Sequence, residues 1–223
     1  MNLIELSDYY LDAIGAGSDF NNVYFALSKS EVCQIQTDST DDAHNFLKAL
    51  ATLVHPVSGT YRFMGKEIDF SDYRKLLPIK KKIGYIGQDA TMVSNRTVRE
   101  NLLLMRSYYE NSLSISLDEK VLKLCRMFNL QDKLDVRPGE LRPLDLRMAV
   151  ATRELTKSFD VLLLDSPEDY FGHKTFDPLN EIINNITHSG KAVVFFSHDQ
   201  DFVKTFPNRK ILITNGTLTR VPL

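Results

Sequence analysis

Three carboxylates gather where a helix is expected to begin: Asp38, Asp41 and Asp42. Ser39 or Thr40 is suited to cap this helix, and the spacing from Ser39 to Asp42 matches a capping box. Carboxylates in a first helical turn complement the positive end of the helix dipole. They also repel an anionic ligand, because two like charges about 4 Å apart cost about 1 kcal/mol in water and about 4 kcal/mol at an effective dielectric near 20. The segment is therefore suited to begin a helix and poorly suited to hold an anion.

Three further polar residues follow apolar runs of strand length. Asp165 and Ser166 come after Val161–Leu164, and His198 comes shortly after Ala192–Phe196. A buried aspartate at a strand end and a histidine after a strand are typical of hydrogen-bonded structural groups as well as of reactive ones. Residue type and position leave both interpretations open.

The two apolar runs indicate how the core is built. They are unbroken rather than alternating, which favours strands covered on both faces and hence a parallel sheet flanked by helices. Between them, Pro178–Thr187 has four apolar residues at helical spacing, namely Leu179, Ile182, Ile183 and Ile186. Strand, crossover helix and strand form a βαβ unit, so the sequence predicts an α/β fold with a parallel core sheet.

The remaining segments predict a mixed surround for this core. Turn residues and β-prone side chains in the first third indicate antiparallel strands, whereas the middle of the chain is helical in character. The predicted strands are Asn22–Leu27, Glu31–Ile35 and those within Ser58–Asp69, where Met64-Gly65-Lys66 is a turn. A hairpin is predicted over Arg209–Leu218, with its turn at Asn215-Gly216. The predicted helices are Ala43–Val54, Arg147–Leu155 and two within Thr97–Leu134, joined by a Ser-rich linker near Asn111–Ser116.

Composition excludes several classes of protein. The 223 residues are 43% hydrophobic, which is enough for a core, and the net charge of −2 provides no basic field to attract nucleic acid. Two cysteines, Cys33 and Cys125, are too few for a disulfide framework and are expected to be reduced and buried. The first eight residues lack the basic segment of a signal peptide, and no apolar run reaches membrane-spanning length. We therefore expect a soluble chain that reaches a membrane only through a partner.

Five short motifs add a family resemblance. In chain order they are Pro56-Val57-Ser58-Gly59, Ile83–Gln88, Thr97–Leu102, Asp160–Asp165 and Ser197-His198-Asp199. In this order and spacing they resemble the ATP-binding cassette (ABC) ATPase subunit over nearly the whole chain. The resemblance implies a P-loop NTPase-like parallel core sheet flanked by helices, with an antiparallel β subdomain and a helical subdomain. It divides the single domain 1–223 into a β subdomain and core over 1–88, a helical subdomain over 89–145 and further core over 146–223.

The phosphate-binding loop that this resemblance implies is degenerate. In the family, a Gly-rich loop ending in Gly-Lys-Ser/Thr wraps the phosphates, with the lysine on the β and γ phosphates and the hydroxyl on Mg²⁺. Here the loop falls on residues 37–45, where every glycine is missing. Ala43 stands at the lysine position and His44 at the hydroxyl position. The other positions assigned to the degenerate loop are Thr37, Asp38, Asp41 and Asp42.

The family's signature motif, Leu-Ser-Gly-Gly-Gln, has also changed. It aligns with Leu141, Arg142, Pro143, Leu144 and Asp145. Pro143 removes a backbone N–H donor and Asp145 adds a negative charge. Arg142 is interpreted as a solvated surface arginine rather than a phosphate ligand.

The catalytic glutamate of the family is replaced by Ser166, which cannot act as a general base near neutral pH without an activator. Glu168, two residues further on, is no obvious substitute. Three family positions are retained: Gln88 in the Q-loop, Asp165 in Walker B and His198 in the switch. Asp165, Ser166 and His198 are interpreted as vestigial catalytic residues. Tyr10 is a candidate to stack on adenine, with a core tyrosine as the alternative. No histidine spacing predicts a metal site.

These changes predict a non-catalytic ABC-type subunit of a membrane transport system, which acts as a scaffold or regulator. No ATP or Mg²⁺ is expected. The resemblance implies a transmembrane permease-type subunit as partner. It also implies a homodimer or a heterodimer with another ABC ATPase subunit, and a cytoplasmic location on the inner face of the membrane. An active ATPase with divergent motifs, which would use ATP and Mg²⁺, is the alternative. A free-standing binding module is a third hypothesis, because a fold alone does not settle function.

Overall fold

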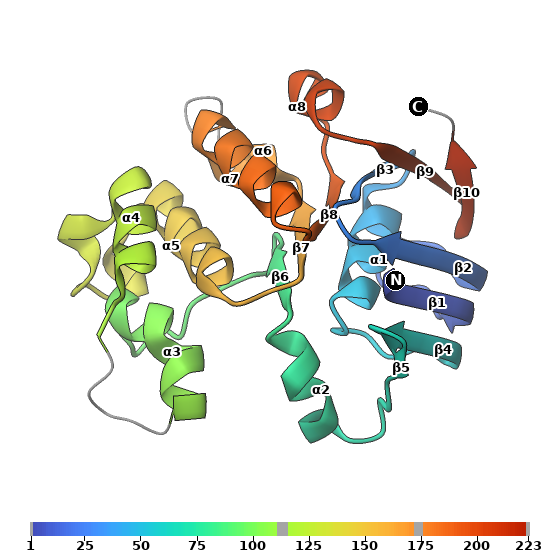
Figure 1. Ribbon diagram of the computed structural model, residues 1–223, viewed down its shortest axis with the longest axis horizontal. Helices are drawn as coiled ribbons and strands as arrows, with labels where there is room; N and C mark the ends of the chain where they lie inside the picture. The colour runs from blue at the N-terminus through green and yellow to red at the C-terminus, as the bar shows by residue number, and fades with distance from the viewer. Residues whose placement is uncertain (1, 111–115, 172–175, 222–223) are drawn as a thin grey trace.

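The computed structural model describes residues 2–110, 116–171 and 176–221, which form two sheets and the helices around them (Figure 1). The strands are β1 (Asn2–Leu11), β2 (Phe20–Ser28), β3 (Val32–Thr37), β4 (Ser58–Phe63), β5 (Lys66–Glu67), β6 (Ile83–Ile86), β7 (Val161–Asp165), β8 (Ala192–Phe196), β9 (Arg209–Thr214) and β10 (Thr217–Val221). The helices are α1 (Thr40–Leu50), α2 (Tyr73–Lys80), α3 (Val98–Glu110), α4 (Glu119–Met127), α5 (Pro143–Thr156), α6 (Pro167–Phe171), α7 (Phe176–His188) and α8 (Gln200–Thr205).

A six-stranded sheet, with the strand order β10-β9-β3-β8-β7-β6, forms the core. Its strand pairs from β9 to β6 are parallel, and the β9–β10 hairpin is antiparallel. β7 and β8 are buried at every position, which confirms that their unbroken apolar runs are strands covered on both faces. Leu162 and Leu164 belong to one apolar cluster and Val161 and Leu163 to another, one on each side of the sheet.

The second sheet is antiparallel, with the order β2-β1-β4-β5. Helix α1 lies between the two sheets (Figure 1), and its apolar stripe of Phe46, Leu47 and Leu50 is buried in the cluster that both sheets share. This arrangement packs α1 against β3, β7 and β8. The predicted α/β fold with an antiparallel β subdomain is therefore confirmed.

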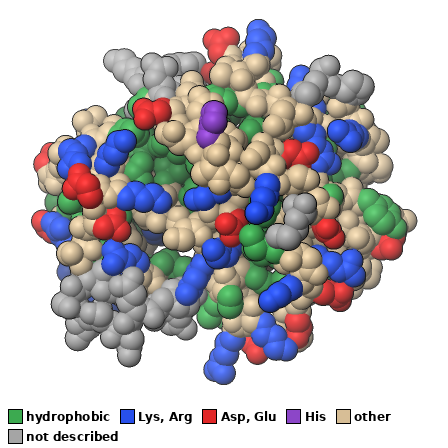
Figure 2. All heavy atoms as spheres, viewed as in Figure 1, with side chains coloured by type: hydrophobic (Ala, Val, Ile, Leu, Met, Phe, Trp, Pro, Cys, Tyr) green, Lys and Arg blue, Asp and Glu red, His purple; other side chains and the backbone are tan. Residues whose placement is uncertain are grey.

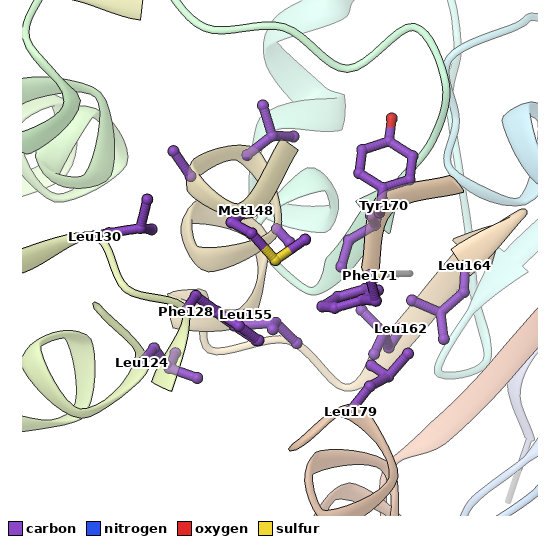
Figure 3. Packing of buried hydrophobic residues seen from close by; sticks show 14 of the residues in the cluster. Leu124, Phe128, Leu130, Met148, Leu155, Leu162, Leu164, Tyr170, Phe171 and Leu179 are labelled. Atoms are coloured by element: carbon purple, nitrogen blue, oxygen red, sulfur yellow. The ribbon is translucent and has the colours of Figure 1, made fainter. Parts of the chain in front are cut away.

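The opposite face of the six-stranded sheet is covered by helices. Residues of α3 to α8 form the larger apolar cluster together with one face of the sheet. In Figure 3, Phe171 and Leu179 lie near Leu162 and Leu164 of β7, and Leu155 lies beside Phe128. This part corresponds to the predicted helical subdomain and the adjoining core. The residue boundaries between the three predicted regions stay a prediction.

Several predicted bounds differ from the structure. The helix predicted over residues 43–54 starts at Thr40 and ends at Leu50, because Thr52 has a positive φ of 57° and Leu53 is 48% exposed. The helix predicted from Arg147 starts at Pro143, since proline is tolerated at the first helical position. The linker near residues 111–116 falls mostly outside the described residues.

Candidate functional site

The connection between β3 and α1 is short. Only Asp38 and Ser39 separate the end of the strand from the start of the helix. Ser39 caps the helix, since its hydroxyl accepts from the backbone N–H of Asp42 and its carbonyl from that of Ala43, both at 3.3 Å. Within residues 36–43, all of which the structure describes, no φ is positive. The backbone N–H groups of Ser39, Asp42 and Ala43 therefore have acceptors within the segment itself.

Asp42 points away from this connection toward the loop between β1 and β2. Its carboxylate accepts from the backbone N–H of Ser18 (2.6 Å) and from the Ser18 hydroxyl (3.1 Å), and it is only 1% exposed. Close by, the side-chain amide of Asn45 donates to the Ile14 carbonyl (2.8 Å). The β1–β2 loop is thus fastened to the first turns of α1.

This placement corrects one expectation. Three carboxylates were expected to face an incoming anion, but only Asp38 and Asp41 are exposed, because Asp42 is satisfied by the chain itself. Thr37 is also engaged, since its hydroxyl accepts from the backbone N–H of Ser39 (3.0 Å). Ala43, which the resemblance assigns to the lysine position, is fully buried.

His44 connects α1 to the ends of two strands. Its Nδ1 contacts Oδ2 of Asp165, at the end of β7, and its Nε2 lies 3.2 Å from Oδ2 of Asp89, which follows β6. Lys48, one helical turn further along α1, places its ammonium 2.5 Å from the same Asp89 oxygen. The four side chains form a continuous polar cluster across the carboxyl edge of the sheet.

Asp165 is the buried member of this cluster, with a fully buried side chain. Burial raises the pKa of the Asp165 carboxyl, and the contacts with His44 and Tyr85 oppose that rise. The Tyr85 hydroxyl donates to Oδ2 (3.3 Å), the oxygen that His44 also contacts. Oδ1 is buried without a hydrogen-bond partner among the described residues.

The pKa of the exposed Asp89 carboxyl shifts in the opposite direction to that of Asp165. The hydrogen bond from Lys48 lowers the pKa of the Asp89 carboxyl, and His44 contributes further. Neither Asp89 nor Lys48 was predicted as a site residue. The spacing of four between His44 and Lys48 places both on one helix face and was a usable signal. The sequence carried no comparable spacing signal for Asp89, since its partners His44 and Lys48 lie far away in sequence.

Gln88 lies beside Ser166. Its amide nitrogen is 3.4 Å from the Ser166 hydroxyl and 3.4 Å from Oδ2 of Asp169. Ser166 has a positive φ of 51°, and its backbone N–H donates to the Phe196 carbonyl (2.9 Å). The hydroxyl therefore stands in a fixed turn, but no base that would activate it contacts it among the described residues.

Glu168 has a role that sequence reasoning missed. Its carboxylate accepts from the Ser197 hydroxyl and from the backbone N–H of His198, each at 2.7 Å. It thereby fixes the turn between β8 and α8 rather than facing Gln88. The His198 side chain is exposed and packs edge-on against Phe196. Glu168 and His198 lie 30 positions apart in sequence, so no spacing rule linked them.

The signature region forms the start of α5. Arg142 donates to both carboxylate oxygens of Asp145, at 2.8 and 3.2 Å, and Lys133 lies 3.6 Å from the same carboxylate. The bonds from Arg142 lower the pKa of the Asp145 carboxyl. Arg142 was expected to be merely solvated, but although exposed it is paired. Leu141 is half-buried against the larger cluster and Leu144 is 52% exposed.

Within the described residues, the candidate adenine-stacking residue Tyr10 forms no hydrogen bond with the cluster of His44, Lys48, Asp89 and Asp165. The Tyr10 hydroxyl donates to Oδ1 of Asp12 (2.8 Å), and Tyr9 is buried in the core. No group of three metal-ligating side chains gathers within residues 2–110, 116–171 and 176–221. Over the same ranges, every helix is too short or too polar to cross a membrane.

Sequence comparison finds relatives among transporter proteins. The profile of a family described as ABC transporter matches residues 44–169, more than half of the chain. The chain is 26% identical over 207 residues to the Methionine import ATP-binding protein MetN of Mannheimia succiniciproducens, covering 91% of this chain and 60% of that protein. It is 27% identical over 187 residues to the Macrolide export ATP-binding/permease protein MacB of Campylobacter jejuni, covering 83% and 29%. The chain thus spans only part of the length of these relatives.

Structural comparison gives the same fold. A bacterial ABC transporter cassette solved as a dimer superposes with a TM-score of 0.81 at 20% identity, covering 98% of this chain and 99% of that one. A dimeric post-hydrolysis cassette bound to ADP and Pi superposes equally well, at 19% identity. The fold, the order of the motifs around β6, β7 and β8, and the family profile agree, and the chain belongs to the ABC transporter family.

Proposed function

We propose that this chain is a cassette subunit of a membrane transport system that no longer binds or hydrolyses ATP, and that it acts as a scaffold or regulator on a permease-type subunit. The observation that carries the proposal is the contact of His44 with Asp165, because it occupies the place where the family holds Mg²⁺ and phosphate.

The phosphate half of a nucleotide site does not fit the residues present. Phosphate binding at a helix N-terminus needs backbone N–H groups that are free to point at the anion. Here the N–H groups of Asp42 and Ala43 are used within the capped helix, and Ala43 offers no cation. The ammonium of Lys48 is paired with Asp89. The exposed Asp38 and Asp41 add repulsion that grows as water is excluded.

The magnesium half does not fit either. Mg²⁺ prefers oxygen ligands in octahedral geometry, and His44 offers nitrogen where the family offers a hydroxyl. One Asp165 oxygen is engaged by His44 and Tyr85, and the other is enclosed in the protein. With Ser166 in place of the catalytic glutamate, no residue here is assigned to activate water. We derive no catalytic step through ATP or Mg²⁺.

Isothermal titration of the purified chain with ATP and ADP, with and without Mg²⁺, tests this part of the proposal. We expect no saturable heat up to millimolar nucleotide. The matched comparison is the triple variant Gln88→Ala, Asp165→Ala and His198→Ala, which should behave like the wild type. Micromolar binding by the wild type, with turnover above that of the triple variant, would establish the active-ATPase alternative instead.

A groove beside Gln88 supports the docking part of the proposal. With a volume of about 460 Å³, it lies between the end of α1, α2, β6 and α5. Leu53 is 48% exposed at its edge, and four cations but only two carboxylates line it. The Lys80 ammonium there donates to the Thr52 carbonyl, and burial and the nearby Lys157 lower the pKa of Lys80. We propose that a short cytoplasmic helix of the permease-type subunit docks here and brings an acidic residue.

Site-directed crosslinking in the native cell tests this docking. Cys33 and Cys125 are buried, so a single introduced surface cysteine is selective. We expect Leu53→Cys to crosslink to a protein with several membrane spans. Val57→Cys, at a residue that is 57% exposed outside the groove, should not. Equal crosslinking from both positions, or none from Leu53→Cys, would favour a free-standing binding module.

In this proposal the chain works at the inner face of the membrane through its partner. It pairs as a homodimer or with another cassette subunit. Both halves of a composite nucleotide site are altered, since the phosphate loop is capped and the signature segment begins with Pro143. Pairing with an intact cassette would therefore leave each composite site lacking one half, which supports a structural rather than a power-stroke role.

A further inference from the structure

A second groove has a lining that shares no residue with the His44 cluster. It lies between α4 and α7, over the end of α5, and has a volume of about 240 Å³. Figure 2 shows it as a hollow with hydrophobic side chains at its floor and lysine or arginine side chains at its rim. We call it the α4–α7 groove. Neither the family motifs nor the proposed docking of a permease uses it.

The floor of the α4–α7 groove is the outer edge of the larger apolar cluster. Leu124, Leu155 and Phe159 are almost fully buried, and Met127 and Ile182 are partly exposed above them. Leu124 and Leu155 lie beside Phe128 in the interior view (Figure 3). The floor is therefore rigid and apolar, and it belongs to a packed core rather than to a loop. An apolar chain laid on it would remove further apolar surface from water.

The rim of the groove is positively charged. Lys120 and Lys123, from α4, face Lys191, which follows α7, and Glu181 is the single carboxylate in the lining. None of these three lysines forms an ion pair within the described residues. The Lys191 ammonium lies over the Phe159 ring, 4.8 Å from its centroid. The rim thus presents cations above an apolar floor.

The two opposed lysines influence each other. Desolvation lowers the pKa of Lys120, the Lys191 ammonium lowers it further, and Asp118 works against both. This repulsion is relieved when an anion lies between the two ammonium groups, because an opposite charge within about 4–6 Å stabilises both. The groove therefore combines apolar burial with a place for one negative charge.

We propose that the α4–α7 groove binds a single-chain anionic amphiphile, with its apolar chain on Leu124, Leu155 and Phe159 and its anionic head between Lys120 and Lys191. Size favours this occupant over a protein helix. An α-helix with side chains is about 10–12 Å across, so it would rest mostly outside the groove. The volume is also just below the range of about 300–1,000 Å³ that is usual for ligand sites, which suits one chain.

Isothermal titration of the full chain with dodecanoate, below its micellar concentration, tests the proposal. We expect saturable binding of one dodecanoate per chain, and none with dodecylammonium or acetate. The double variant Lys120→Gln/Lys191→Gln should weaken dodecanoate binding at least about tenfold. Its matched control is Lys66→Gln/Lys204→Gln, which removes two exposed charges elsewhere and should leave binding unchanged.

A second pair of variants tests the groove itself without altering the core. Asn185 is exposed and lines the groove, so Asn185→Trp should fill it and abolish dodecanoate binding. Its neighbour Asn184 lies outside this lining, and Asn184→Trp should bind as the wild type does. Absence of saturable binding, or equal loss in both tryptophan variants, would overturn the proposal. So would binding of an acidic amphipathic peptide that Asn185→Trp blocks while dodecanoate does not bind.

Discussion

The imidazole of His44, on α1, contacts the carboxylate of Asp165, at the end of β7, across 121 positions of the sequence. In the proposed function, this contact takes the place of the metal and phosphate that the family holds between a helix start and a strand end. The contact also gives the buried Asp165 carboxyl a hydrogen-bonding partner, and burying a carboxylate without a partner is costly in free energy.

Restoring the missing lysine should not restore nucleotide binding. In Ala43→Lys the capped helix start, His44 and the exposed Asp38 and Asp41 all remain. We expect isothermal titration of this variant with Mg-ATP to show no saturable heat. Micromolar affinity in the single variant would mean that the charge at residue 43 was the only defect, and the account of the capped loop would fail.

The His44–Asp165 contact should contribute to stability. Replacing His44 with alanine leaves the Asp165 carboxylate buried without its imidazole partner, at an expected cost of about 1–3 kcal/mol in the free energy of unfolding. Urea denaturation at pH 7 measures this. His198→Ala, at an exposed histidine, is the control and should change stability by less than about 0.5 kcal/mol. A coupling energy near zero between His44→Ala and Asp165→Asn would show that the contact contributes nothing.

The Arg142–Asp145 pair should make stability depend on pH. Because Arg142 lowers the folded-state pKa of Asp145, the pair stabilises the fold above the ordinary aspartate pKa of about 3.9. That stabilisation is lost as the pH falls through the lowered folded-state value. We expect Asp145→Asn to lose about 1 kcal/mol at pH 7 and progressively less below pH 4. A loss that stays constant from pH 7 to pH 2 would exclude the charge as its cause, and Asp41→Asn is the exposed control.

Glu168 should order the turn after β8. Glu168→Ala removes the acceptor of the Ser197 hydroxyl and of the His198 N–H, so hydrogen exchange at His198 should become faster. The expected loss of stability is about 1–2 kcal/mol. Glu168→Gln retains an acceptor oxygen and should lie between the alanine variant and the wild type. If both variants exchange at the wild-type rate, Glu168 does not hold this turn.

Elements with strong local signals were predictable. Unbroken apolar runs predict β7 and β8. Asn215-Gly216 predicts the β9–β10 hairpin, and the positive φ values of these two residues, 48° and 71°, suit a primed turn. β1 was missed because its register shifts break the period of two and bury the adjacent Leu3 and Ile4. α2 was missed because it contains Pro78 and buries a single side chain.

By itself the sequence determined the family fold and showed that residues 37–45 contain no glycine and no lysine, since these follow from residue type and order. Only the tertiary structure decided which of the remaining polar groups meet. Hydrogen bonding and ion pairing fall off within a few ångströms, so they depend on how α1 is seated against the ends of β6 and β7. That seating turned Asp42 toward Ser18 and brought His44 onto Asp165, contacts that no spacing along the chain could specify.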